Sequence, residues 1–114
     1  MKIPKKIHQV WIGEKEPPAW CVKFGEEMQA MHPDWEYKLW NESNIPKLVN
    51  QDIYDKLPKH RYCFKSDIIR YEIVYKYGGV YADMDMFCYK DFFNELTYSD
   101  YFLRILKNQC RTDF

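Results

Sequence analysis

Two carboxylates stand two residues apart in Asp83-Met84-Asp85, where a predicted strand over residues 80–83 meets a loop. Divalent cations such as Mg²⁺ or Mn²⁺ prefer oxygen ligands and keep positions for water and substrate phosphates. In an extended strand the two side chains share a face but lie about 6–7 Å apart. The spacing therefore predicts one direct ligand and one that acts through water or a ligand hydroxyl. The alternative interpretation is a pair of solvated turn residues.

Asp67 and Arg70 lie three residues apart on a predicted helix over residues 66–77, and therefore on one helix face. A carboxylate accepts hydrogen bonds from sugar hydroxyls, and a guanidinium donates to hydroxyls or phosphate oxygens. The pair could therefore grip a polyol from two sides. The alternative is an exposed ion pair worth about 0.2–0.5 kcal/mol.

Trp11 ends a predicted strand over residues 7–12 and could offer its indole face to a nucleobase. Its alternative role is packing in the core. Gly78-Gly79 follows the helix that carries Asp67, and we interpret it as a left-handed helix cap. No G-x-x-x-x-G-K-[ST] sequence is present, so a phosphate loop of that type is excluded.

Alternating strands and helices must position these residues. Further elements are predicted as a strand over residues 37–40, a helix over 20–31, and a helix that opens at Pro46 and ends before Pro58. The side chains expected to face inward from these two helices are Trp20, Phe24, Met28 and Met31 in the first, and Leu48, Val49 and Ile53 in the second. This order favours an α/β sheet that binds ligands at the carboxyl ends of its strands.

The composition narrows the function classes. The 114 residues suit one domain, and Lys+Arg 17 against Asp+Glu 17 leaves no basic surface for nucleic acid. No apolar run reaches the roughly 20 residues of a membrane span. Nothing near the first residue matches a signal peptide, so reduced cysteines are expected. The four cysteines and three histidines lack metal-ligand spacing, and the histidines are expected to be structural.

In chain order, four segments carry a resemblance to a known family. They are I-P-K-K-I-H-Q-V-W-I-G over residues 3–13, Y-K-L-W over 37–40, S-D-I-I-R-Y over 66–71, and Y-G-G-V-Y-A-D-M-D-M over 77–86. The chain resembles, over roughly residues 3–96, the DXD-containing sugar-transferase family. That family includes initiation-specific α-1,6-mannosyltransferases and bacterial capsule and lipopolysaccharide sugar transferases. The same block is similar to the catalytic domain of the large clostridial glucosylating toxins.

The resemblance implies a GT-A fold, a Rossmann-like α/β sandwich that binds a nucleotide-sugar. By carry-over, Trp11 would stack on the base, and Tyr81 would line the nucleotide pocket. Asp67 and Arg70 would hold the donor sugar. We therefore expect these four residues to bind the donor.

The resemblance also implies metal-dependent catalysis. Asp85 would ligate Mn²⁺ or Mg²⁺ directly, and Asp83 would contact ribose and sugar or reach the metal through water. The reaction implied is transfer, with retention, from a UDP- or GDP-sugar to a glycan or lipid-linked acceptor. Surface-polysaccharide synthesis and a cytoplasmic location, peripheral at the inner membrane face, are the expected setting.

Two departures from the family pattern shape a further expectation. The large residues Cys63-Phe64-Lys65 precede Ser66, where relatives have small ones. The chain extends only about thirty residues beyond Asp85, with an amphipathic helix predicted over 99–107. We therefore expect the single domain 1–114 to be the N-terminal, donor-binding portion of a GT-A fold, completed by a second chain or a C-terminal half. The alternatives are a catalytically incomplete nucleotide-sugar-binding remnant and a carbohydrate-binding module.

Overall fold

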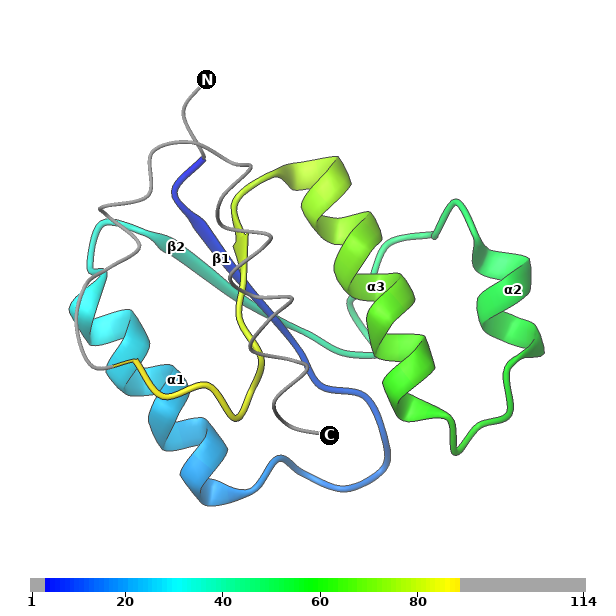
Figure 1. Ribbon diagram of the computed structural model, residues 1–114, viewed down its shortest axis with the longest axis horizontal. Coiled ribbons are helices and arrows are strands. Elements are labelled where there is room, and N and C mark those ends of the chain that lie inside the picture. The colour runs from blue at the N-terminus through cyan, green and yellow to red at the C-terminus, as the bar shows by residue number, and fades with distance from the viewer. Residues whose placement is uncertain (1–3, 89–114) are drawn as a thin grey trace.

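The computed structural model describes residues 4–88, which form a parallel three-stranded sheet with helices beside it (Figure 1). The strands are β1 (Lys6–Val10), β2 (Glu36–Trp40) and β3 (Val80–Tyr81), and the helices are α1 (Ala19–Met31), α2 (Gln51–Lys56) and α3 (Tyr62–Tyr77). The sheet order is β2-β1-β3, with both neighbours parallel to β1. The predicted α/β class is confirmed, and the arrangement is consistent with part of a Rossmann-like fold.

The chain winds to opposite sides of the central strand. From β1 it passes through α1 to β2 on one edge, and it returns through α2 and α3 to β3 on the other edge (Figure 1). Gly25 of α1 lies against the Gln9 side chain, whereas the Tyr77 ring of α3 lies 6.3 Å from that of His8. Because neighbouring strand residues face opposite sides, α1 and α3 cover opposite faces of the sheet.

The core joins apolar residues from the strands to one stripe of each long helix. Its most completely buried members include Ile7 and Val80 from the sheet, Met28 from α1, and Ile69 and Ile73 from α3. Burial of these side chains from both faces of the sheet is the main driving force for the fold. None of the helices within residues 4–88 is long and apolar enough to cross a membrane.

His8 is a buried structural histidine, as the sequence predicted. Its Nε2 donates to the backbone oxygen of Gly78 at 2.8 Å, and its Nδ1 accepts from Trp40 Nε1 at 3.0 Å. Trp40 Nε1 can only donate, so the ring is neutral with its proton on Nε2. Burial lowers the pKa of His8, which agrees with this neutral form. The residue therefore joins β1 to β2 and to the end of α3.

The prediction for α1 is confirmed in its limits but wrong for one side chain. Trp20 is 53% exposed, and the buried stripe is formed by Cys21, Gly25 and Met28. Trp20 lies one position from this stripe, so the helix turns it away from the sheet. The aromatic ring instead packs edge-on against Phe24, with ring centres 5.6 Å apart.

The helix predicted from Pro46 is wrong over its first half. The segment before α2 is a loop, and Val49 and Ile53 are 87% and 53% exposed, so neither faces the core. The carboxylate of Glu72, on α3, accepts hydrogen bonds from the backbone N–H groups of Val49 and Asn50. This contact from a distant helix satisfies the loop backbone, which local periodicity could not reveal.

The start of α3 and the end of β3 differ from the predicted limits. Helix α3 begins at Tyr62, four residues before Ser66, and ends as predicted at Gly78, whose φ is 71°. Strand β3 ends at Tyr81 rather than at Asp83, where a turn closed by the Met86 N–H begins. The helix predicted over residues 99–107 lies outside the described residues.

Candidate functional site

A cavity of 880 Å³ opens at the carboxyl ends of β1 and β3. The connection from β1 leads away to β2 on one side, while β3 lies on the other, so the cavity lies where the strand order reverses. Open α/β sheets bind ligands at such a point. Its lining includes every residue singled out from the sequence: Trp11, Asp67, Arg70, Tyr81, Asp83 and Asp85. A cavity of 230 Å³ beside Lys6 and Trp40 contains none of them.

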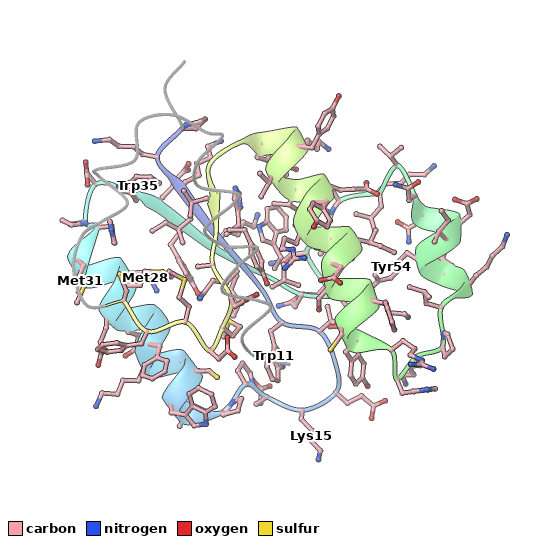
Figure 2. The ribbon with its side chains drawn as sticks, in the orientation of Figure 1. Trp11, Lys15, Met28, Met31, Trp35 and Tyr54 are labelled. Carbon is pink, nitrogen blue, oxygen red and sulfur yellow. The ribbon has the colours of Figure 1, made fainter. Side chains whose placement is uncertain are left out.

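Trp11 follows β1 and lines this cavity, and Figure 2 shows it between α1 and α3. Its backbone N–H donates to Trp40 O at 2.9 Å, and its indole Nε1 donates to Lys15 O at 2.7 Å. The loop at Gly13 is held by Glu42, whose carboxylate accepts from the Gly13 N–H at 2.8 Å. The indole is half-buried and outside the core cluster. These contacts favour a positioned ring face over a packing role.

We expect Trp11→Ala to weaken nucleotide binding more than it destabilises the domain. Stacking of a base on an aromatic side chain is worth about 1–3 kcal/mol in nucleic-acid binders. Loss of a core tryptophan instead costs about 3–5 kcal/mol of stability. Calorimetric titration with UDP and GDP and urea unfolding measure the two effects. Trp35→Ala, at a position only 9% exposed, is the matched core substitution.

If Trp11→Ala loses as much stability as Trp35→Ala, the packing interpretation is correct. If its nucleotide affinity stays at the unsubstituted value, the base does not stack on this ring.

Asp67 and Arg70 form an ion pair inside the cavity. Arg70 Nη2 lies 3.0 Å from Asp67 Oδ1, with the Arg70 side chain 20% and the Asp67 side chain 51% exposed. The guanidinium also lies 5.3 Å from the Tyr81 ring centre and 4.9 Å from that of Tyr71. The aromatic contacts hold a cation at the cavity wall. The ion pair of the alternative interpretation exists, and it stands where a bound sugar could reach it.

The D-x-D residues occupy a turn, which corrects the extended geometry predicted for them. The backbone oxygen of Asp83 accepts from the Met86 N–H at 3.1 Å, so the chain reverses over these four residues. Between the two carboxylates Met84 is buried, while Asp83 is half-buried and Asp85 is exposed. The buried methionine anchors a turn that keeps both carboxylates on the cavity lining.

Asp85 also approaches the first turn of α1. Burial raises the pKa of the Cys21 thiol, and the negative charge of Asp85 raises it further. Cys21 lines the same cavity, only 3% exposed. The site therefore brings together the ends of β1 and β3 and the beginnings of α1 and α3.

The donor set fits a divalent ion that shares its ligands with a substrate. Within residues 4–88 no group of three His, Cys, Asp or Glu side chains could hold a metal alone. Among these described residues, Asp67, which pairs with Arg70, does not join Asp83 and Asp85 in a three-carboxylate ligand set. Asp83 and Asp85 supply two carboxylates on the cavity lining. Magnesium-type sites commonly use one or two carboxylates and complete the shell with phosphate and water.

Sequence reasoning did not single out three of the residues that shape this site. Glu42 and Lys15 hold the loop of Trp11, and Gln9 contacts the backbone of Asp83. Gly13 at the end of the predicted strand indicated a turn there. Glu42, which accepts from the Gly13 N–H, lies 29 residues away and could not be identified in this way. A glutamine within a β-branched and aromatic run was the available sequence signal for Gln9.

Comparison with known proteins adds evidence independent of this geometry. The family described as "Glycosyltransferase sugar-binding region containing DXD motif" matches residues 18–103. Inositol phosphoceramide mannosyltransferase 3 of Schizosaccharomyces pombe is 37% identical over 92 residues, which cover 75% of this chain and 25% of that protein. Inositol phosphoceramide mannosyltransferase 1 of the same organism is 38% identical over 96 residues, which cover 78% of this chain and 30% of that protein.

A more distant relative is named for the linkage that it forms and not for an acceptor. The initiation-specific alpha-1,6-mannosyltransferase of Candida albicans is 29% identical over 93 residues, 72% of this chain and 24% of its own length. No solved structure gives a significant match. The chain thus spans about a quarter to a third of the length of these relatives.

Proposed function

The chain belongs to the glycosyltransferase family that carries the DXD motif, and from that membership we propose that its cavity binds a nucleotide-activated mannose for transfer to an acceptor. One observation carries the proposal: all six residues singled out from the sequence line the cavity where the strand order reverses. The sheet and its helices would form the donor-binding portion of a GT-A fold.

Trp11, Arg70 and Asp67 would bind the base, the phosphates and the sugar of the donor. The Trp11 ring offers a face to the base, whether uracil or guanine, because every base has a π-face. Arg70, backed by Tyr81, donates to hydroxyl or phosphate oxygens. Asp67 accepts from sugar hydroxyls through a carboxylate that the ion pair keeps beside Arg70. The base would thus be held after β1 and the sugar beside α3.

Asp83 and Asp85 would hold the divalent ion, Mn²⁺ or Mg²⁺, on the turn after β3. When bound, such an ion supplies Lewis-acid stabilisation of the departing diphosphate. The two aspartates give it a fixed position at the cavity wall, and Asp83 would also reach the ribose or the sugar. The ion and the Arg70 guanidinium would together place positive charge where the leaving group gains negative charge.

The names of two relatives guide the choice of acceptor. Both are named for inositol phosphoceramide, so we propose a lipid-linked acceptor in preference to a soluble glycan or a surface polysaccharide. An acceptor of this kind requires the whole protein to act at a membrane surface. A peripheral location on the cytoplasmic side, as expected from the sequence, would meet this requirement.

Thermal unfolding tests the proposal directly. We expect UDP- or GDP-mannose to raise the unfolding temperature in Mn²⁺ and to raise it much less in excess chelator, because ligands that bind the folded state stabilise it. Transfer to lipid-linked and glycan acceptors is then assayed with the stabilising donor. Binding without transfer would indicate the donor-binding remnant. Stabilisation by free glycans, unaffected by nucleotide or Mn²⁺, would indicate a carbohydrate-binding module.

We expect Asp67→Asn to weaken binding of the nucleotide-sugar about tenfold while the fold persists. The amide keeps the shape but loses the charge that strengthens hydrogen bonds from sugar hydroxyls. Affinity for the bare nucleoside diphosphate should change much less, because that ligand has no sugar. Calorimetry with both ligands in Mn²⁺ measures the difference.

Asp52→Asn, an exposed change on α2 outside the cavity, is the matched control. Equal losses for the two ligands would mean that Asp67 acts on the metal or the backbone. No loss for either ligand would leave Asp67 as half of an exposed ion pair.

A further inference from the structure

The side chain of Gln9 is a polar group buried completely beneath the D-x-D turn. Its exposed fraction is 0%, and it lies within β1, one residue before the end of the strand. Gln9 Nε2 donates to the backbone oxygen of Asp83 at 3.2 Å, and Gln9 Oε1 accepts from the Tyr37 hydroxyl at 2.5 Å. A backbone oxygen only accepts, so the amide nitrogen must face Asp83 and the amide oxygen must face Tyr37.

Two neighbouring elements, β2 and α1, hold this amide in place. Tyr37 reaches it from β2, on the same face of the sheet. On the other side, a Cβ added to Gly25 of α1 would lie 3.1 Å from Gln9 Oε1 and 3.5 Å from the Tyr37 hydroxyl, so the helix packs closely here. Burial raises the pKa of Tyr37, which keeps its hydroxyl protonated as a donor.

The contact with Asp83 falls on the turn that carries both acidic residues. The Asp83 oxygen accepts from Gln9 and also from the Met86 N–H that closes the turn. Any shift of this carbonyl moves the peptide that joins Asp83 to Met84, and with it the start of the turn. A buried amide with a single allowed orientation therefore fixes the turn relative to the sheet.

We propose that Gln9, oriented by Tyr37, is a positioning residue that holds the Asp83–Asp85 turn in the geometry that binds a divalent ion with a nucleoside diphosphate. The inference rests on the proposed function, because it assigns Gln9 a part in the same site. Gln9 does not line the cavity, so it acts only through Asp83. Outer partners of this kind typically change metal affinity by about 10–100-fold when substituted.

Gln9→Glu gives a test with a distinctive pH dependence. A protonated carboxyl can donate to Asp83 O and accept from Tyr37, whereas its ionised form can only accept and would repel the Asp83 oxygen. Burial raises the pKa of such a carboxyl. We therefore expect Mn²⁺ affinity, measured with UDP or GDP by electron paramagnetic resonance, to be close to the unsubstituted value at pH 5.5 and about tenfold weaker at pH 8.

Gln29→Glu is the matched control. Gln29 Nε2 donates to the Gly25 oxygen at 3.3 Å, so this change also replaces a bonded amide but leaves Asp83 untouched. We expect neither the control nor the unsubstituted chain to lose Mn²⁺ affinity as the pH rises. If Gln9 had only a structural role, Gln9→Glu would lower the unfolding temperature, but its Mn²⁺ affinity would not fall between pH 5.5 and pH 8.

Tyr37→Phe keeps the inference falsifiable if Gln9→Glu does not fold. It removes the donor that orients the amide, and we expect a severalfold loss of Mn²⁺ affinity with faster hydrogen exchange over residues 82–88, also without metal. Unchanged Mn²⁺ binding and exchange in Tyr37→Phe, or identical profiles for Gln9→Glu and Gln29→Glu, would overturn the inference alone. Failure of the unsubstituted chain to bind Mn²⁺ with nucleotide would overturn the proposed function as well.

Discussion

Asp85→Asn will remove the gain in nucleoside diphosphate affinity that Mn²⁺ confers, with a loss of about a hundredfold or more in Mn²⁺ binding. The affinity of oxygen-ligand sites depends on the number of charged ligands, and the neutral amide withdraws one of only two carboxylates on the turn. Asp85 is exposed, so the substitution should leave stability nearly unchanged. Calorimetric titration of UDP and GDP, in Mn²⁺ and in excess chelator, measures the effect.

Asp83→Asn is the informative companion variant. We expect a smaller loss in Mn²⁺ binding, because Asp83 would reach the ion through water or contact the ribose instead. The same loss for both variants would make both aspartates direct ligands. Equal nucleotide affinity of the unsubstituted chain in Mn²⁺ and in chelator would contradict the metal site itself.

Gly79→Ala will have the largest effect on stability, a loss of more than about 3 kcal/mol. Gly79 has φ of 92°, which L side chains rarely adopt, and an added Cβ would lie 2.5 Å from the backbone oxygen of Lys6. That oxygen belongs to β1, so the clash separates the start of β3 from the central strand. Urea unfolding followed by circular dichroism measures the loss.

Gly13→Ala separates the backbone strain of a positive φ from the steric clash with β1. Gly13 also has positive φ, at 123°, but its added Cβ would meet the Tyr62 ring no closer than 3.4 Å, an ordinary contact. We expect it to lose only the strain of about 1–3 kcal/mol. Equal losses in both variants would show that the close approach to β1 contributes nothing.

Much of the site could be predicted because its motifs are local. The apolar pattern of the helix before Gly78, the cap itself and the following β-branched strand are decided within a few residues. Parallel strands end at the same edge of a sheet, so residues after β1 and β3 had to meet there. This rule predicts one binding site for both segments, and Trp11 and Asp83 do line the same cavity.

The sequence by itself thus determined the α/β class, the family and the group of residues that lines the cavity. Only the tertiary structure decided that the acidic pair lies in a turn, that Trp20 faces away from the core, and that Gln9 supports Asp83. The physical reason is the distance along the chain over which each interaction acts. Hydrophobic periodicity and capping act over a few residues, whereas the bond from Gln9 to Asp83 spans 74 positions and forms only when β1, β2, α1 and the turn have packed together.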